Sequence, residues 1–254
     1  MNTRKDQLEA FNRLLDIMDE LREKCPWDRK QTNETLRTLS IEEIYELSDA
    51  IIEKDSDEIK KELGDVFLHL VFYSKIASEQ GQFDVADVLN SICDKLIHRH
   101  PHIYGDTVAD TEEKVLQNWE KLKLKEGNKS VLSGVPTSLP ALVKAYRIQD
   151  KVKGVGFEFE NTDQVFEKIQ EEIIEFKNEE NPIDREMEFG DILFSLVNYG
   201  RFVGINSEDA LEKSNKKFIK RFQILEELAE QNGQVIGDMT LTELENLWNL
   251  AKIR

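Results

Sequence analysis

The sequence predicts an all-α protein built from two copies of one helical unit. The composition is the first reason, because 33% of the residues are charged and 39% hydrophobic, with only 12 glycines and 5 prolines, a balance that favours helices over sheets. The second is periodicity, since Ile44, Leu47 and Ile51 recur at helical spacing rather than alternating. The third is an internal repeat: the string EEIYE at 42–46 returns as EEIIE at 171–175.

Two further strings return in the same order. ELGD at 62–65 returns as EFGD at 188–191, and KLIHR at 95–99 returns as KFIKR at 217–221. Each string recurs after about half the chain, which indicates a tandem duplication. We therefore expect a first repeat at residues 1–126, a connector at 127–139 and a second repeat at 140–254.

Capping residues and breakers place the elements of each repeat in order. An acidic helix carries the first string, and a turn leads to a second helix. That second helix starts at Asp55 in the first repeat and at Asn181-Pro182 in the second, residues that suit an N-cap and a first helical position. It runs on into an apolar stretch, Val66–Tyr73 in the first repeat, whose apolar groups surround the helix and predict burial. Glycines and prolines interrupt the connector, and helix resumes at about Ala141.

The chain is strongly acidic, with 51 acidic against 34 basic side chains and a net charge of −17. This balance argues against nonspecific binding to nucleic acids or membrane surfaces. Cys25 and Cys93 are the only cysteines, and they stand too far apart in sequence for a disulfide framework or a thiolate zinc site to be expected. The N-terminus lacks the apolar core of a signal peptide. We expect a cytoplasmic protein.

The repeated strings concentrate carboxylates. At about 100° per residue, Glu42, Glu43 and Glu46 lie on one side of a helix, which alone is typical of a solvated acidic face. Glu62 and Asp65, however, lead directly into the apolar stretch, where buried carboxylates need partners. If the two helices pack antiparallel, four or five carboxylates converge and repel by roughly 3 kcal/mol per pair. All-oxygen ligation then favours Mg²⁺, with Mn²⁺ as a second choice.

Histidines offer weaker alternatives. A di-iron bundle would need Glu-x-x-His, and no histidine stands three residues after a glutamate. His69 lies on the face of Glu62, but the second repeat has Ser195 there, which favours a core or supporting histidine over a metal ligand. The string HRHPH at 98–102 could indicate zinc, but its proline breaks helical register and no carboxylate or cysteine completes a ligand set, so a loop role is preferred.

Two basic pairs follow the acidic strings. Lys95 with Arg99, and Lys217 with Arg221, stand one helical turn apart. Recurrence of this spacing in both copies favours a phosphate clamp over a solvated surface. The second repeat carries two further lysines here, where the first has an acid and a histidine. We therefore expect the second repeat to hold the better-equipped site.

Together these features resemble the MazG family of nucleoside triphosphate pyrophosphohydrolases. The likeness rests on Glu-Glu-x-x-Glu followed by Glu-x-x-Asp, twice, and it extends to CPWD at 25–28, Gln31-Thr32, RHPH at 99–102, Asn118-Trp119 and Leu247-Trp248. The resemblance implies an all-α fold in which each repeat dimerises to complete four-helix bundles. It also implies Mg²⁺-dependent cleavage of a nucleoside triphosphate to the monophosphate and pyrophosphate. Asn33 departs from the family pattern, which leads us to expect histidine there.

The resemblance further implies the site residues. The metal ligands map onto five carboxylates in each repeat, namely Glu42, Glu43, Glu46, Glu62 and Asp65, and Glu171, Glu172, Glu175, Glu188 and Asp191. Substrate binding maps onto Lys168, Lys217, Arg221 and Trp248, with Lys95 and Arg99 as the basic pair of the first repeat. We assign catalysis to Glu172, Glu175, Lys217 and Arg221.

The prediction is a homodimeric, Mg²⁺-dependent hydrolase of nucleoside triphosphates, in which water attacks a phosphorus in line and one carboxylate orients that water. Two alternatives stay open. One is a narrow-specificity relative that acts on dUTP or phosphoribosyl-ATP, and the other is a non-catalytic helical regulator or partner-binding protein that keeps the metal site for stability.

Overall fold

The computed structural model describes residues 1–105, 107, 111, 114–115 and 130–253. The described residues form helices, turns and loops but no strand, so the predicted all-α class is confirmed. The chain divides into two compact units, Met1–Val115 and Leu116–Arg254. Among the described residues, no helix has an apolar stretch of the length that spanning a membrane requires. Residues 118–119 and 127–129, which belong to the family motifs and the predicted connector, lie outside the described residues.

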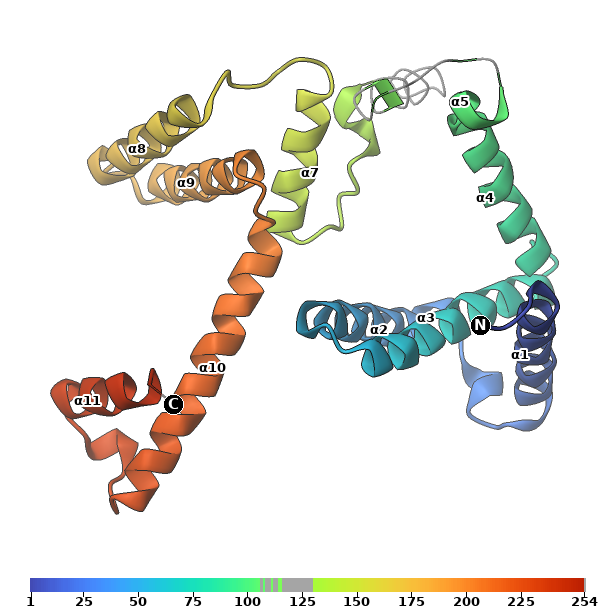
Figure 1. Cartoon of the computed structure of the whole chain (residues 1–254), viewed down its shortest axis with the longest axis horizontal. Helices are drawn as coiled ribbons and strands as arrows, with labels where there is room; N and C mark the ends of the chain where they lie inside the picture. Colours follow the sequence, from blue (N-terminus) through green and yellow to red (C-terminus); the bar gives the residue numbers. More distant parts are fainter. Residues whose placement is uncertain (106, 108–110, 112–113, 116–129, 254) are drawn as a thin grey trace. The chain divides into compact units, whose positions relative to one another are not determined.

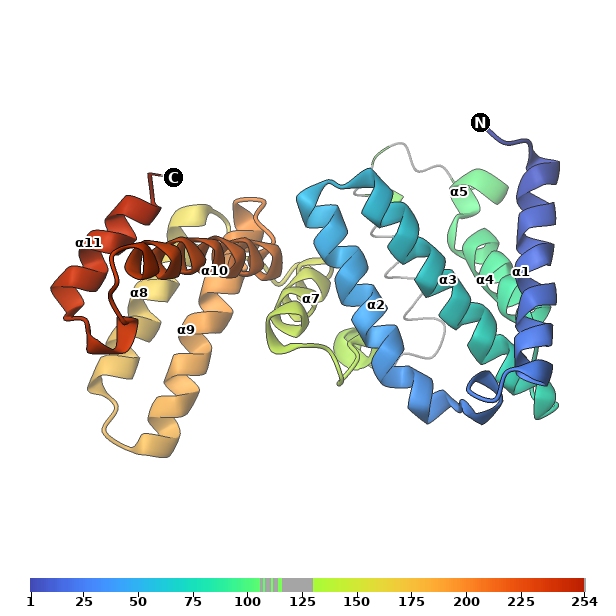
Figure 2. The same ribbon diagram turned by 90° about the horizontal axis from the view of Figure 1, so that it is seen from below.

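The first unit is built around one long antiparallel pair of helices. Figures 1 and 2 show α2 and α3 side by side, with α1 and α4 packed on α3. The helices of this unit are α1 (Arg4–Lys24), α2 (Asn33–Glu53), α3 (Ser56–Glu79), α4 (Val85–Arg99) and α5 (Pro101–Tyr104), with a 3₁₀ turn η1 (Asp28–Lys30) after α1.

Local sequence explains the α2–α3 turn. The Asp55 carboxylate accepts hydrogen bonds from the backbone N–H groups of Asp57 and Glu58, so the predicted start of α3 is confirmed. Lys54, just before it, adopts a left-handed backbone with φ 59°, and its N–H bonds back to the last turn of α2. This tight reversal holds the acidic face of α2 against α3.

The core of the first unit lies among α1, α2 and α3. Met18, Leu36 and Phe72 are fully buried there, together with Val71 and Ile76. The apolar stretch of α3 is only partly covered in the single chain, because Phe67 is 50% exposed and Leu70 57%, and its complete burial stays a prediction. The neighbouring helices of one repeat cover only part of the circumference of α3.

The second unit repeats the helical pair and extends it. The elements are η2 (Val131–Gly134), α7 (Ala141–Lys153), α8 (Thr162–Asn178), α9 (Pro182–Phe202), α10 (Ser207–Gln231), η3 (Ile236–Asp238) and α11 (Leu241–Ala251). Helices α8 and α9 form the pair, α7 packs on α9, and α11 packs on α10. The predicted helix start at Asn181-Pro182 is confirmed, since the Asn181 side chain caps α9 and the proline takes its first turn. Ala141 begins α7, also as predicted.

Candidate metal centres

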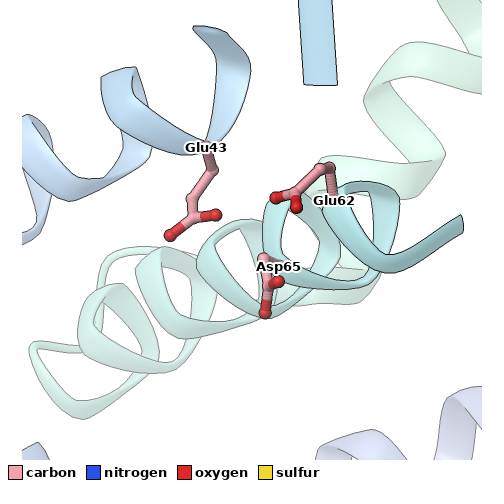
Figure 3. A group of neighbouring side chains, drawn as sticks. All are labelled: Glu43, Glu62 and Asp65. Carbon is pink, nitrogen blue, oxygen red and sulfur yellow. The ribbon is translucent and has the colours of Figure 1, made fainter. Parts of the chain in front are cut away.

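One group of carboxylates lies between α2 and α3. Glu43 on α2 faces Glu62 and Asp65 on α3, and one carboxylate oxygen from each lies within 4.8 Å of the others (Figure 3). Glu62 and Asp65 are three residues apart and therefore share a helix face. The tight turn between the helices brings Glu43 onto that face.

Burial makes this arrangement costly without a cation. Glu62 is only 3% exposed; its Oε1 accepts a hydrogen bond from Lys61 Nζ at 2.9 Å, whereas its buried Oε2 has no partner among the described atoms. Burial, followed by the nearby charge of Asp65, raises the pKa of Glu43. The Lys61 ammonium donates hydrogen bonds to the carboxylates of Glu62 and Glu58, and these two bonds raise the pKa of Lys61. One lysine thus compensates part of the negative charge.

The second repeat forms the equivalent group. Glu172 on α8 and Glu188 and Asp191 on α9 offer oxygens within 4.8 Å of one another, and these residues occupy the same places in their strings as Glu43, Glu62 and Asp65. Here the buried member is Glu172, whose Oε1 lies 2.7 Å from Lys168 Nζ. The duplicated strings therefore fold into duplicated carboxylate groups.

Lys168 has a role that the sequence pattern did not reveal. Besides Glu172 it pairs with Glu171 at 2.9 Å, and these hydrogen bonds raise its pKa. Glu175, one turn further along α8, is exposed to solvent, and the partial desolvation of its carboxylate followed by the charge of Glu172 raises its pKa. The first repeat has Leu39 at the place of Lys168, so the two groups are balanced by lysines from different helices.

The other predicted ligands lie on the same helices but outside these close groups. Glu42 and Glu46 contribute charge that raises the pKa of Glu43, and both are exposed on α2. Glu171 and Glu175 are exposed on α8. The structure thus brings three carboxylates of each predicted set of five into contact distance, and the ligand roles of the outer four stay predictions.

The donor set fits a hard divalent cation. Each group offers carboxylate oxygens alone, which suits Mg²⁺ or Mn²⁺, and the unpartnered Glu62 Oε2 is an acceptor that a cation would satisfy. In the part of the chain that is described, no candidate metal group contains a histidine. His69 is buried in α3, as expected of a core histidine, and burial lowers its pKa. The HRHPH string is not a loop, because α4 ends at Arg99 and α5 starts at Pro101.

The predicted basic residues lie elsewhere in the single chain. Lys95 and Arg99 are on α4, and Lys217 and Arg221 are on α10, which runs away from α8 and α9 (Figure 1). Neither Lys217 nor Arg221 forms an ion pair with a described acidic residue. Trp248 packs on Phe218, beside Lys217, with ring centroids 5.0 Å apart. Within a single chain, Lys217, Arg221 and Trp248 therefore lie apart from the carboxylates of the second repeat.

A cavity of about 510 Å³ adjoins the carboxylates of the second repeat. Lys168, Glu172 and Asp191 form part of its wall. Its remaining lining comes from α7, α8, α9 and the α7–α8 loop, and includes Gln149, Val152, Phe157, Phe159, Phe194, Asn198 and Arg201. Sequence patterns missed this cavity, because its lining residues are scattered over three helices and a loop and form no motif.

Relatives match the chain over nearly its whole length. A sequence profile of the MazG nucleotide pyrophosphohydrolase domain matches residues 31–104, which contain the first carboxylate group. The nucleoside triphosphate pyrophosphohydrolase/pyrophosphatase MazG of Thermotoga maritima is 43% identical over 247 residues, covering 95% of each chain. The nucleoside triphosphate pyrophosphohydrolase of Escherichia coli K12 is 38% identical over 257 residues, covering 96% of this chain and 98% of that one. The uncharacterized protein YabN of Bacillus subtilis is 43% identical over 251 residues, which cover 95% of this chain and 51% of YabN.

Proposed function

Because the chain belongs to the MazG family, we propose that it is a nucleoside triphosphate pyrophosphohydrolase, which cleaves ribo- or deoxyribonucleoside triphosphates to the monophosphate and pyrophosphate. The observation that carries this proposal is the pair of equivalent carboxylate groups in a chain that matches such enzymes along nearly its whole length. Membership of the family supports the reaction only by analogy. The two carboxylate groups add the residues that metal-assisted hydrolysis would need.

The cofactor of this reaction is Mg²⁺, with Mn²⁺ as a substitute. Glu172, Glu188 and Asp191 would hold it in the second repeat, and Glu43, Glu62 and Asp65 in the first. When bound, the cation supplies positive charge that neutralises the triphosphate and the developing charge on the phosphorus oxygens. The outer carboxylates Glu171, Glu175, Glu42 and Glu46 complete the two ligand sets.

Residues of the second repeat would carry the remaining steps. Glu175 stands one turn from Glu172 on α8, and its carboxylate is a group that can accept a proton. It would orient a water molecule for in-line attack and take up its proton. Lys168, Lys217 and Arg221 would bind the phosphates through charge-assisted hydrogen bonds, and Trp248 supports the basic face of α10 through its contact with Phe218.

The working form is a homodimer. Phe67 and Leu70 on α3, and Leu193 and Leu196 on α9, are between 41% and 57% exposed in the single chain, and a second copy would cover them by completing four-helix bundles. A second copy is also a source of the basic residues that α10 carries away from its own α8–α9 pair. We place the protein in the cytoplasm, where its free cysteines Cys25 and Cys93 stay reduced.

The test is pyrophosphate release from the common ribo- and deoxyribonucleoside triphosphates, with and without Mg²⁺. A broad-range enzyme releases pyrophosphate from several of them only when Mg²⁺ is present. Release from dUTP alone, or none from this panel but release from phosphoribosyl-ATP, would identify a narrow-specificity relative. Release from none of these substrates would leave a non-catalytic helical protein.

A further inference from the structure

The cavity of the second repeat has the size and polarity of a nucleoside site. Its volume of about 510 Å³ falls in the range of small-molecule sites. Its lining includes the metal-competent residues Glu172 and Asp191 together with the aromatic residues Phe157 and Phe194. A triphosphate held at the carboxylates would therefore leave its nucleoside end next to an apolar, ring-lined space.

The oxygen of a buried amide in this cavity has no hydrogen-bond partner among the described atoms. Gln149 on α7 is 4% exposed, and its Nε2 donates to the carbonyl oxygen of Phe194 at 2.8 Å. That bond fixes the orientation of the amide, so Oε1 is the remaining acceptor. Oε1 receives no hydrogen bond from any atom of the described chain. A buried acceptor without a donor is costly, so this position demands a ligand that brings an N–H or O–H group.

Two polar residues of the cavity lining, Arg201 and Asn198, are held in place by hydrogen bonds. Arg201 forms a two-pronged ion pair with Glu158, at 2.7 and 2.5 Å, and it also donates to Asn198 Oδ1 at 2.8 Å. These bonds fix the positions of the guanidinium and of the Asn198 side chain in the cavity wall. Polar groups held in fixed positions can discriminate between ligands of similar shape, because they favour the ligand whose donors and acceptors match them.

The first repeat fills the corresponding place. Asn198 follows Asp191 at the same spacing at which Phe72 follows Asp65, so the duplicated strings align Asn198 with Phe72. Phe72 is only 2% exposed and packs against Met18 and Leu36 in the core of the first unit. The same position thus holds a core phenylalanine in the first repeat and a cavity-lining asparagine in the second. This difference favours a packing role for Phe72 and a binding role for Asn198.

We propose that this cavity binds the nucleobase of the substrate and that Gln149 Oε1 accepts a hydrogen bond from an exocyclic amino group of the base. This inference rests on the proposed function and adds base selection to it. Cytosine offers an amino group where uracil, a ring of the same size, offers a carbonyl oxygen. A carbonyl facing Gln149 Oε1 leaves two acceptors opposed, so the site prefers cytosine to uracil.

The test measures the affinities of CMP and UMP for the full-length protein by titration calorimetry, a readout that does not depend on turnover. The wild-type protein should bind CMP about tenfold or more tightly than UMP. In Gln149→Met, which keeps the side-chain length and removes the acceptor, the ratio should fall to about one. Gln82→Met makes the same chemical change at an exposed position of the first repeat and should keep the wild-type ratio.

Asn198→Phe provides a second variant, because it introduces the residue of the first repeat into the cavity. It should abolish binding of both nucleotides at concentrations where the wild type is saturated. Because the CMP-to-UMP ratio compares two ligands on one preparation, partial unfolding of a variant does not change it. Equal affinities for CMP and UMP in the wild type, or a preference that survives in Gln149→Met, would overturn the proposal.

The two measurements distinguish a failure of base selection by Gln149 from a failure of the proposed hydrolase function. If the wild type prefers CMP to UMP but releases pyrophosphate from no triphosphate, the cavity assignment holds and the hydrolase assignment falls. If it hydrolyses CTP and UTP alike and binds CMP and UMP equally, the hydrolase assignment holds and base selection by Gln149 falls.

Discussion

Removing divalent cations should destabilise this protein, because each of its carboxylate groups brings three acidic side chains close together. Within each group the oxygens lie no more than 4.8 Å apart, a separation at which two unit charges repel by about 3.5 kcal/mol at an effective dielectric constant of 20. Lys61 at 2.9 Å from Glu62 and Lys168 at 2.7 Å from Glu172 offset part of this repulsion. A bound cation would compensate the remaining charge.

Binding linkage sets the size of the effect. Mg²⁺ at 100 times its dissociation constant should raise the free energy of unfolding by about 2.7 kcal/mol per site. The measurement is urea unfolding followed by circular dichroism, once in excess EDTA and once in saturating Mg²⁺. The increment should disappear when a chelator is added back to the Mg²⁺ sample.

Two substitutions on α3 make this test specific. Asp65→Asn removes one carboxylate of the first group, so the metal-free protein should become more stable and the Mg²⁺ increment should lose the part that comes from this site. Asp57→Asn makes the same change in the exposed first turn of α3, where Asp57 pairs with Lys60 at 3.2 Å, and it should leave the increment unchanged. If wild-type unfolding is the same in EDTA and in Mg²⁺, the acidic faces are merely solvated and the metal assignment is refuted.

Three further predictions follow from other contacts. Glu158→Gln should lower the free energy of unfolding by about 3 kcal/mol, because it leaves the 6% exposed Arg201 side chain without its charge partner; a loss below about 1 kcal/mol in urea titration would contradict this. The bond from Arg22 lowers the pKa of Glu79 below its ordinary 4.5, so this pair stabilises the fold above that pH and its contribution is lost as the pH falls through the folded pKa. Glu79→Gln should therefore cost about 1 kcal/mol at neutral pH and progressively less in acid, whereas a cost independent of pH would refute the pairing. Light scattering should give twice the 29.5 kDa of one chain, and a folded, active monomer at micromolar concentration would exclude the dimer.

Local chemistry made much of the fold predictable. The start of α3 follows from the Asp55 carboxylate and that of α9 from Asn181-Pro182, because a cap depends only on the few residues around it. The members of each carboxylate group follow from the i, i+3 spacing on one helix and a short turn to the next. The duplication strengthened this argument, since an acidic face on one helix alone is ordinary.

Contacts between distant segments could not be predicted. The exposure of Phe67 and Leu70 depends on which helices cover α3, and hydrophobic pattern does not say whether the cover comes from the same chain. The cavity around Gln149 forms only where α7, α8 and α9 pack together. The hydrophobic periodicity of each helix does not predict a cavity among the three.

The central claim is that the carboxylate group of the second repeat hydrolyses the substrate, and the equivalent substitutions Glu172→Gln and Glu43→Gln test it most directly. Each substitution replaces a carboxylate with a neutral amide at the equivalent position of one of the two groups. Each variant is therefore the control for the other. Pyrophosphate release should be measured in saturating Mg²⁺, with folding confirmed by circular dichroism. We expect Glu172→Gln to lose activity about 100-fold and Glu43→Gln to retain most of it. Equal losses, or a larger loss in Glu43→Gln, would contradict this assignment.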